Sequence, residues 1–139
     1  TNGVEGQALF SKCMAGHKND LTVTVSGEER EYSWEQQRCD LLYTGSRETG
    51  TATEYISREN CSDEVKPYIT LPPGHTLGWK DALMNALYTF YQSVQDGSYK
   101  KDKMEYATFA DGWRGNCFVD ACLKSAEENR WVSLEEERR

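Results

Sequence analysis

Alternation of apolar and polar side chains dominates the first part of the chain and predicts β-strands. Residues 21–25 alternate without a break and are rich in β-branched side chains, which favour the pleated strand conformation. Residues 26–29 contain serine, glycine and glutamate and predict a turn. Residues 30–34 then alternate again, with Tyr32 and Trp34 on one face, so the two segments are expected to pair as a hairpin.

A second hairpin is expected next, although its first strand is ambiguous. Ser33 and Gln36 have the spacing of a capping box, so a helical turn competes with a strand through residues 36–43. We favour the strand, because residues 44–50 are rich in turn formers and residues 51–57 alternate once more.

Proline marks the end of this strand-rich part. Residues 65–71 predict one more short strand, and Pro67 places it at a sheet edge, where the missing N–H does no harm. Pro72, Pro73 and Gly74 then break the chain. Because neither side of this break is long enough to bury a comfortable core alone, we expect a joint inside a single domain that spans residues 1–139.

The strongest helical pattern lies behind this break. Its apolar stripe recurs every three or four residues and consists of Trp79, Leu83, Ala86, Leu87, Phe90 and Val94. Thr76 is the expected N-cap of this helix and Gly97 its stop. Residues 4–14 predict a shorter N-terminal helix that is followed by Gly16 as a C-cap.

The remaining segments complete the expected pattern. Residues 104–109 alternate as a late strand, and Asp111 and Gly112 form a turn. Residues 116–128 predict a C-terminal helix, and residues 135–139 a solvated tail. Runs of strands followed by helices favour an α+β fold over a parallel α/β arrangement. We therefore expect an antiparallel sheet of four to six strands packed against one long helix, with shorter N- and C-terminal helices.

The cysteines suggest that this fold is stabilised by disulfides. They are Cys13, Cys39, Cys61, Cys117 and Cys122, and their spacings are too irregular for a zinc ribbon or a redox CxxC pair. Two bridges and one unpaired thiol leave the connectivity open. The alternative is that several are reduced core residues, since cysteine packs as a small hydrophobe. We expect disulfides and, with them, secretion.

Charge and hydropathy restrict the partners. The formal net charge is −7, and lysine and arginine are scattered among acids, which argues against nucleic acid as a partner. The basic run of Lys100, Lys101 and Lys103 is diluted by Asp102 and Glu105. No segment approaches the roughly 20 apolar residues of a membrane span. A protein partner is the expectation that remains.

The two histidines are candidates for acid–base chemistry. His75 lies at the expected start of a helix, where the helix dipole keeps the imidazole neutral and basic. Glu54 and Arg58, four apart on an expected strand, would share one face and supply a carboxylate and a phosphate-binding cation. These three would serve a ribonuclease-like hydrolase if they converge. Otherwise His17 and His75 are glycine-flanked surface residues, and the chain has no catalytic residue.

No motif for a metal or cofactor stands out. Cys13 and His17 are spaced as half of a zinc site that Cys117 and Cys122 would complete, but the spacing of the second pair is wider than zinc sites use. Gly112 and Gly115 enclose no phosphate loop, because the Lys-Ser/Thr ending is missing. We therefore expect no metal and no cofactor.

Trp113 and Arg114 form the candidate binding patch. They lie between two glycines in an expected turn, and an exposed tryptophan beside an arginine is a good contact for a partner surface. The alternative is that Trp113 closes one end of the core.

The composition as a whole favours a binding protein over an enzyme. We expect a secreted, disulfide-stabilised protein of effector or toxin-like type, a virulence protein that acts on a host or partner protein outside the cell or after delivery into a host cell. The first alternative is a small secreted ribonuclease-like hydrolase. The second is a carbohydrate-binding module, which needs coplanar exposed aromatic rings.

Overall fold

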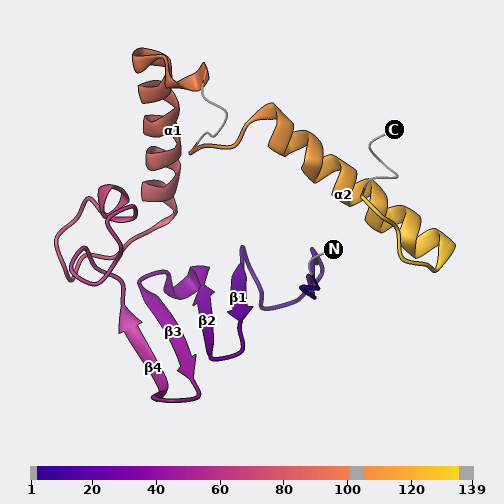
Figure 1. Cartoon of the computed structure of the whole chain (residues 1–139), viewed down its shortest axis with the longest axis horizontal. Helices are drawn as coiled ribbons and strands as arrows, with labels where there is room; N and C mark the ends of the chain where they lie inside the picture. Colours follow the sequence, from indigo (N-terminus) through magenta and orange to yellow (C-terminus); the bar gives the residue numbers. More distant parts are fainter. Residues whose placement is uncertain (1–2, 101–104, 135–139) are drawn as a thin grey trace. The chain divides into compact units, whose positions relative to one another are not determined.

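The computed structural model of the chain describes residues 3–100 and 105–134 (Figure 1). It divides into two compact units, Thr1–Gly78 and Trp79–Arg139, each with its own internal contacts. The single domain expected over residues 1–139 stays a prediction. Most of the expected basic run and the expected tail over residues 135–139 lie outside the described residues.

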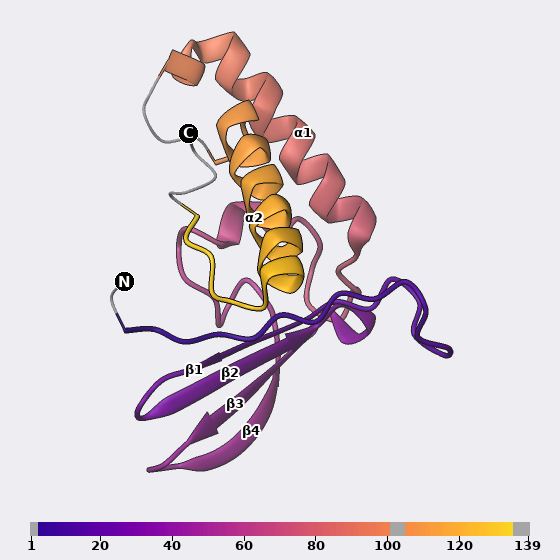
Figure 2. The same cartoon turned by 90° about the vertical axis from the view of Figure 1, so that its right-hand side faces the viewer.

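Four antiparallel strands form the sheet of the first unit. They are β1 (Thr22–Ser26), β2 (Arg30–Glu35), β3 (Leu41–Ser46) and β4 (Gly50–Tyr55), and their spatial order is β1-β2-β3-β4. Figure 2 shows them side by side as a twisted meander. The two hairpins that the alternation predicted, β1 with β2 and β3 with β4, are confirmed.

The register gives the sheet one apolar and one hydroxyl-rich face. Val23 is paired with Trp34, and Trp34 with Leu42, so these apolar side chains share a face. Thr24 and Ser33 are paired on the other face, where their hydroxyl groups share a hydrogen bond of 2.8 Å. Cross-strand pairs of this kind stabilise a sheet and fix its register.

The connection between β2 and β3 contains both a helical turn and a strand. The 3-10 helix η1 (Gln36–Arg38) comes first, and the strand expected over residues 36–43 therefore starts later, at Leu41. The turn before β4 is limited to residues 47–49. Gly50 follows with a φ of 79°, a left-handed conformation that glycine adopts without steric cost.

The strand expected over residues 65–71 was a wrong prediction. A 3-10 helix, η2 (Lys66–Tyr68), occupies this position. Pro67 explains the difference, because its fixed φ suits the first helical positions and its missing N–H removes a ladder bond. Ile69, which follows directly, is 5% exposed and anchors this irregular segment.

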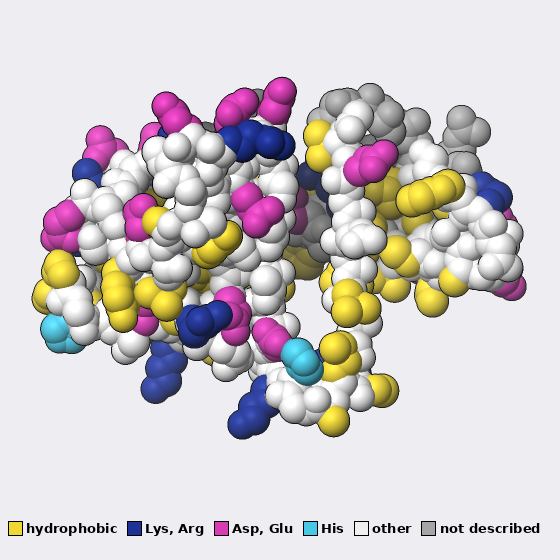
Figure 3. All heavy atoms as spheres, turned by 90° about the horizontal axis from the view of Figure 1, so that it is seen from below, with side chains coloured by type: hydrophobic (Ala, Val, Ile, Leu, Met, Phe, Trp, Pro, Cys, Tyr) yellow, Lys and Arg dark blue, Asp and Glu magenta, His cyan; other side chains and the backbone are white. Residues whose placement is uncertain are grey.

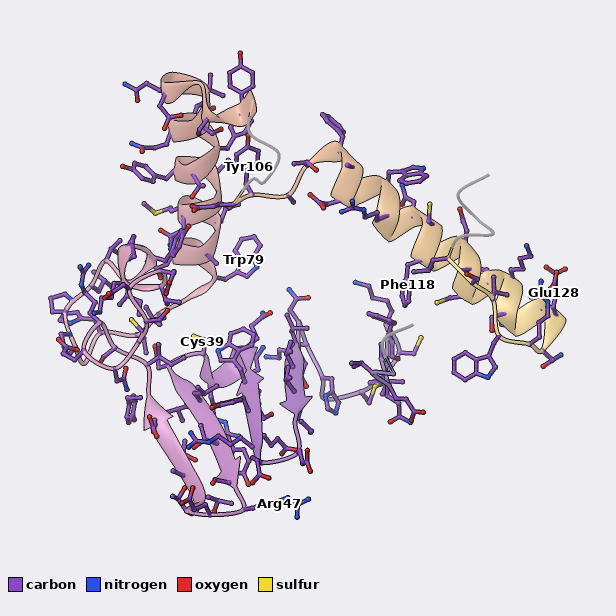
Figure 4. The ribbon with its side chains drawn as sticks, viewed as in Figure 1. Cys39, Arg47, Trp79, Tyr106, Phe118 and Glu128 are labelled. Carbon is purple, nitrogen blue, oxygen red and sulfur yellow. The ribbon has the colours of Figure 1, made fainter. Side chains whose placement is uncertain are left out.

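In the second unit, α1 (Trp79–Asp96) confirms the helix that the apolar stripe predicted. It ends before Gly97, whose φ of 75° fits the expected stop, and the 3-10 helix η3 (Ser98–Lys100) follows. Figure 4 shows Tyr106 directed toward α1. Its ring meets Phe90 edge to face with centroids 5.4 Å apart, and its hydroxyl lies 2.9 Å from Oγ of buried Ser93.

The last helix, α2 (Phe109–Glu128), begins earlier than the helix expected over residues 116–128. It includes Asp111 and Gly112, so the turn expected there is wrong. A capping box fixes its start, because the Asp111 N–H donates to Thr108 Oγ1 and the Thr108 N–H donates to the Asp111 carboxylate. This cap offsets part of the cost of the two glycines in the helix, about 1 kcal/mol per residue relative to alanine.

Two other expected elements are also wrong. Residues 105–108 form a bend and an irregular segment instead of a late strand, and Met104 lies outside the described residues. Residues 4–14 form no helix, and Leu9 is 81% exposed. A helix this short is marginal in water, and Gly6 weakens it further. The described chain thus has two long helices rather than one long helix with shorter terminal ones.

The expected disulfides are a wrong prediction, because none of the five cysteines is joined to another in the structure. Cys117 and Cys122 lie five residues apart on α2, so their side chains point to different sides of the helix and cannot meet. Cys39 Sγ lies 2.9 Å from the Leu77 carbonyl, and Cys61 Sγ lies 3.8 Å from the Arg58 carbonyl. The prediction of secretion rested on these disulfides, so it is now without that support and stays a prediction.

Candidate functional site

A tight turn presents His75 at the end of the first unit. Pro72, Pro73, Gly74 and His75 form it, and the His75 N–H donates to the Pro72 carbonyl at 3.2 Å. Gly74 has a φ of 86°. Proline followed by glycine with positive φ is the sequence of a type II turn, so the local residues alone specify this conformation.

The same carbonyl fixes the tautomer of His75. Nδ1 of the ring lies 3.1 Å from the Pro72 oxygen, and a carbonyl oxygen accepts but never donates a hydrogen bond. Nδ1 must therefore carry the proton. In the neutral ring, Nε2 then holds a lone pair on the opposite side of an exposed imidazole, where it can accept a proton or a hydrogen bond.

Two consecutive side chains hold the chain directly behind His75. The Leu77 N–H donates to Oδ1 of Asp40 at 2.5 Å, and the Leu77 carbonyl accepts the Cys39 S–H at 2.9 Å. Both backbone groups of Leu77 are thus bound by the corner formed by Cys39 and Asp40, which lie 38 and 37 residues earlier in the chain. Paired contacts across such a separation limit how far the His75 turn can move.

This corner is in turn fixed to the sheet. Trp34 Nε1 donates to the Cys39 carbonyl at 3.0 Å, and the Ile56 N–H donates to the Asp40 carbonyl at 2.8 Å. Figure 4 shows Cys39 at the end of the sheet, between β2 and β3. Rigid strands therefore position the turn through four hydrogen bonds. The sequence indicated His75 but not the contacts of Cys39 and Asp40 with Leu77, because nothing local pairs these residues.

The structure does not join His75 to the two residues predicted to assist it. Glu54 lies on β4 opposite Leu42. Arg58 lies beyond the end of β4, so it is not on the strand face assumed for it, and its Nη1 donates to the Ile69 carbonyl at 3.0 Å. Within the described residues, no hydrogen bond or ion pair links any two of His75, Glu54 and Arg58.

Exposed carboxylates follow Arg58 in the chain, and the nearer one, Glu59, opposes anion binding there. A hydrogen bond from the Ser57 side chain, reinforced by the backbone, lowers the pKa of Glu59. Ser62 lowers the pKa of Glu64 in the same way. Both carboxyl groups are ionised at neutral pH, so the loop around Arg58 is acidic. This is a poor setting for a phosphate-binding cation.

The second histidine forms an acid–base pair that the sequence analysis overlooked. His17 also ends a turn with glycine in the left-handed region, since its N–H donates to the Met14 carbonyl at 3.2 Å and Gly16 has a φ of 88°. His17 Nδ1 lies 2.6 Å from Oδ2 of Asp20. The His-x-x-Asp spacing was visible in the sequence, but only the turn shows that the two side chains meet.

Trp113 and Arg114 lie on the first turns of α2 rather than in a glycine-flanked turn. Trp113 is 49% exposed, and Arg114 Nη1 lies 3.3 Å from Oδ1 of Asp111. The helix offers both side chains to the surface. Their role as a binding patch stays a prediction.

The distribution of charged, metal-ligating and apolar side chains bears on which partners the described residues could bind. Figure 3 shows acidic and basic side chains interspersed, with no continuous basic face on the side in view. Among the described residues, no three His, Cys, Asp or Glu side chains gather as a metal site requires. In the same residues, neither helix combines the length and the apolar character that crossing a membrane demands.

Comparison with known proteins identifies the family. The family model described as the oxidoreductase family, C-terminal alpha/beta domain (GFO/IDH/MocA) matches residues 2–134. An oxidoreductase from Sinorhizobium meliloti has a similar structure, with a TM-score of 0.77 and 26% sequence identity. The similarity covers 86% of this chain and 34% of that one, so the chain spans about a third of that protein. No curated protein matches the chain significantly.

These matches correct the expected fold class and function. The family's domain is α/β, whereas strands followed by helices favoured α+β; element order does not determine which faces of a sheet the helices cover. The matches are to oxidoreductases and the cysteines form no disulfide, so the prediction of a secreted disulfide-bonded effector or virulence protein is wrong. The same matches contradict the ribonuclease-like and carbohydrate-binding alternatives. The chain belongs to the GFO/IDH/MocA oxidoreductase family and corresponds to its C-terminal α/β domain.

Proposed function

We propose that this chain contributes the C-terminal domain to an oxidoreductase. The observation that carries the proposal is the family match over residues 2–134, nearly the whole chain. The likeness to the Sinorhizobium meliloti oxidoreductase supports it. Since the chain spans about a third of that protein, the redox reaction itself is proposed to need polypeptide in addition to these residues.

The composition of α2 supports a role as one part of a larger protein. Several large apolar side chains of this helix are partly or fully exposed: Phe109, Trp113, Phe118, Val119 and Leu123. Figure 4 shows Phe118 projecting from α2. Exposed apolar side chains of this size, when they lie close together, commonly mark a surface that packs against other protein. The described residues of the second unit bury only Ser93, Cys117 and Ala121, so this unit does not close a core by itself.

The partner of the predicted patch follows from the same reasoning. We assign Trp113 and Arg114 to a protein surface, and we propose that the remainder of the oxidoreductase supplies it. Half-exposed tryptophan beside arginine is the residue combination that dominates protein interfaces. The acidic net charge of −7 fits a protein better than a nucleic acid.

The test is an activity measurement on the longest polypeptide that contains this chain. It is offered alcohols, sugars and hydroxy acids as electron donors, with nicotinamide, flavin and dye acceptors. We expect turnover with at least one pair and loss of turnover when residues 79–139 are deleted. A wild-type protein that reduces no acceptor, or a deletion variant as active as wild type, would contradict the proposal.

A further inference from the structure

The first unit contains an open depression beside β1 that the family assignment does not explain. It encloses about 760 Å³ and lies between β1 and the extended segment that precedes it in the chain. This volume is within the range of small-molecule sites. Apolar side chains, among them Phe10 and Leu21, line one part of it, and charged side chains line another.

The charged part of the lining is basic. Lys12 and Lys18 contribute two ammonium groups, and Asp20 is the one acidic residue of the lining. Asp20 is also engaged, because its Oδ2 accepts the His17 Nδ1–H at 2.6 Å. In a chain with a net charge of −7, this is a local excess of positive charge. Such an excess raises the local concentration of small anions.

His17 is oriented to contact a ligand in this depression. Asp20 holds the Nδ1 side of the ring, and the side chains of His17 and Asp20 are 54% and 29% exposed. Nε2, on the other side of the ring, can accept a hydrogen bond from a hydroxyl group or, when protonated, donate to an anion. The carboxylate partner fixes the orientation of the ring.

The geometry points to a binding site for a small hydroxylated organic anion, a carboxylate or a phosphate ester, held by Lys12, Lys18 and the His17–Asp20 pair. The ammonium groups receive the anionic group, His17 Nε2 receives a hydroxyl or an anionic oxygen, and the apolar lining covers the carbon skeleton. The site belongs to the unit Thr1–Gly78 alone. The proposal therefore does not depend on the proposed oxidoreductase activity.

Carbethoxylation of histidine by diethyl pyrocarbonate provides a residue-specific test in the full chain. The reagent acylates an accessible imidazole nitrogen, and peptide mass spectrometry reports the rate at His17 and His75 separately. The chain has two histidines, and both end a glycine turn with Nδ1 hydrogen-bonded, so His75 is a matched internal control. The probes are inorganic phosphate and gluconate, with sodium chloride at equal ionic strength as the reference.

We expect phosphate or gluconate to slow modification of His17 saturably, by at least about threefold once its concentration exceeds twice the dissociation constant. The rate at His75 should not change. Lys12→Gln and Lys18→Gln should weaken the protection, and Lys80→Gln, on α1, should preserve it. An unchanged His17 rate in both anions would overturn the proposal. Equal protection of His17 and His75, or full protection in the Lys12 and Lys18 variants, would also overturn it.

Discussion

The Asp40 carboxylate accepts a 2.5 Å hydrogen bond from the backbone N–H of Leu77, 37 residues later in the chain. The neighbouring Cys39 thiol donates to the carbonyl of the same residue. Together these contacts connect the end of the sheet to the turn that presents His75. A short polar side chain at a strand end therefore determines the position of a loop that its own sequence surroundings do not specify.

Replacing Asp40 with alanine should release the His75 turn. The Leu77 N–H loses a charged acceptor in a half-buried position, which costs roughly 1–3 kcal/mol of unfolding free energy. Hydrogen exchange should become faster at the Leu77 amide, with a smaller change in the strands. Asp40→Asn keeps an acceptor oxygen and should lie between alanine and wild type. Exchange rates at Leu77 that do not differ between the alanine variant and wild type would show that other contacts hold the turn.

Tyr106 contacts α1 through a hydrogen bond and through its ring, and two substitutions can measure these contributions separately. Tyr106→Phe removes the bond to Ser93 but keeps the edge-to-face contact with Phe90, so we expect a loss of about 1 kcal/mol. Tyr106→Ala also removes the ring and should cost about 3 kcal/mol or more. Urea unfolding followed by circular dichroism measures both. Equal losses in the two variants would mean that the ring contact contributes nothing.

The capping box of α2 predicts a pH dependence. Hydrogen bonds from the Thr108 side chain and backbone hold the pKa of Asp111 below its ordinary value of 3.8. A carboxyl group whose pKa is lower in the folded chain contributes stability above its unfolded pKa, and this contribution is lost as the pH falls through the folded pKa. Thr108→Ala should therefore destabilise α2 at neutral pH, because the N-cap side chain and its contact with Asp111 are lost.

In strongly acidic solution the difference between Thr108→Ala and wild type should shrink, because the protonated, uncharged Asp111 accepts a weaker hydrogen bond from Thr108. Urea unfolding at neutral and at acidic pH measures this change. Thr108→Ser keeps the hydroxyl and should behave as wild type at both pH values. A difference that grows in acid would refute the assignment of the cap.

The state of the cysteines is directly measurable. Alkylation of the denatured, unreduced protein from its native source should add five groups, one for each of Cys13, Cys39, Cys61, Cys117 and Cys122. In the folded protein, exposed Cys13 and Cys122 should react first and buried Cys117 last, because the thiolate must be accessible to react. Addition of three alkyl groups or fewer to the unreduced protein would show that at least two of the cysteines form a disulfide.

The role proposed for Trp113 predicts different effects in two contexts. In the 139-residue chain, Trp113→Ala should leave the helix content unchanged, since half of the side chain is exposed. In a longer oxidoreductase polypeptide it should lower the unfolding free energy by about 2 kcal/mol or more, as expected for a central interface tryptophan. Thermal unfolding of both forms provides the comparison. Losses of the same size in both would place Trp113 in the core of its own unit.

The sequence by itself determined the elements whose signals are local. Strict alternation over residues 21–25 and 30–34 specified a hairpin, and the stripe from Trp79 to Val94 with Gly97 behind it specified α1, because a period of two or of 3.6 is a property of the chain alone. It also contained the start of α2 in Thr108 and Asp111, although the glycines that follow suggested a turn. Five cysteines were a misleading signal, since spacing does not show whether two thiols can approach.

Only the tertiary structure decided which distant groups meet. Glu54 and Arg58 match a catalytic pattern in the sequence, but Glu54 lies opposite Leu42 and Arg58 donates to the Ile69 carbonyl. Nothing in the sequence pairs Cys39 and Asp40 with Leu77, yet both bind it. The pairing of His17 with Asp20 required a turn that brings two side chains within 2.6 Å. A hydrogen bond depends on positions within a few tenths of an ångström, and those positions are set by packing across the whole unit. Local pattern therefore specified the strands and helices, and long-range packing specified the sites.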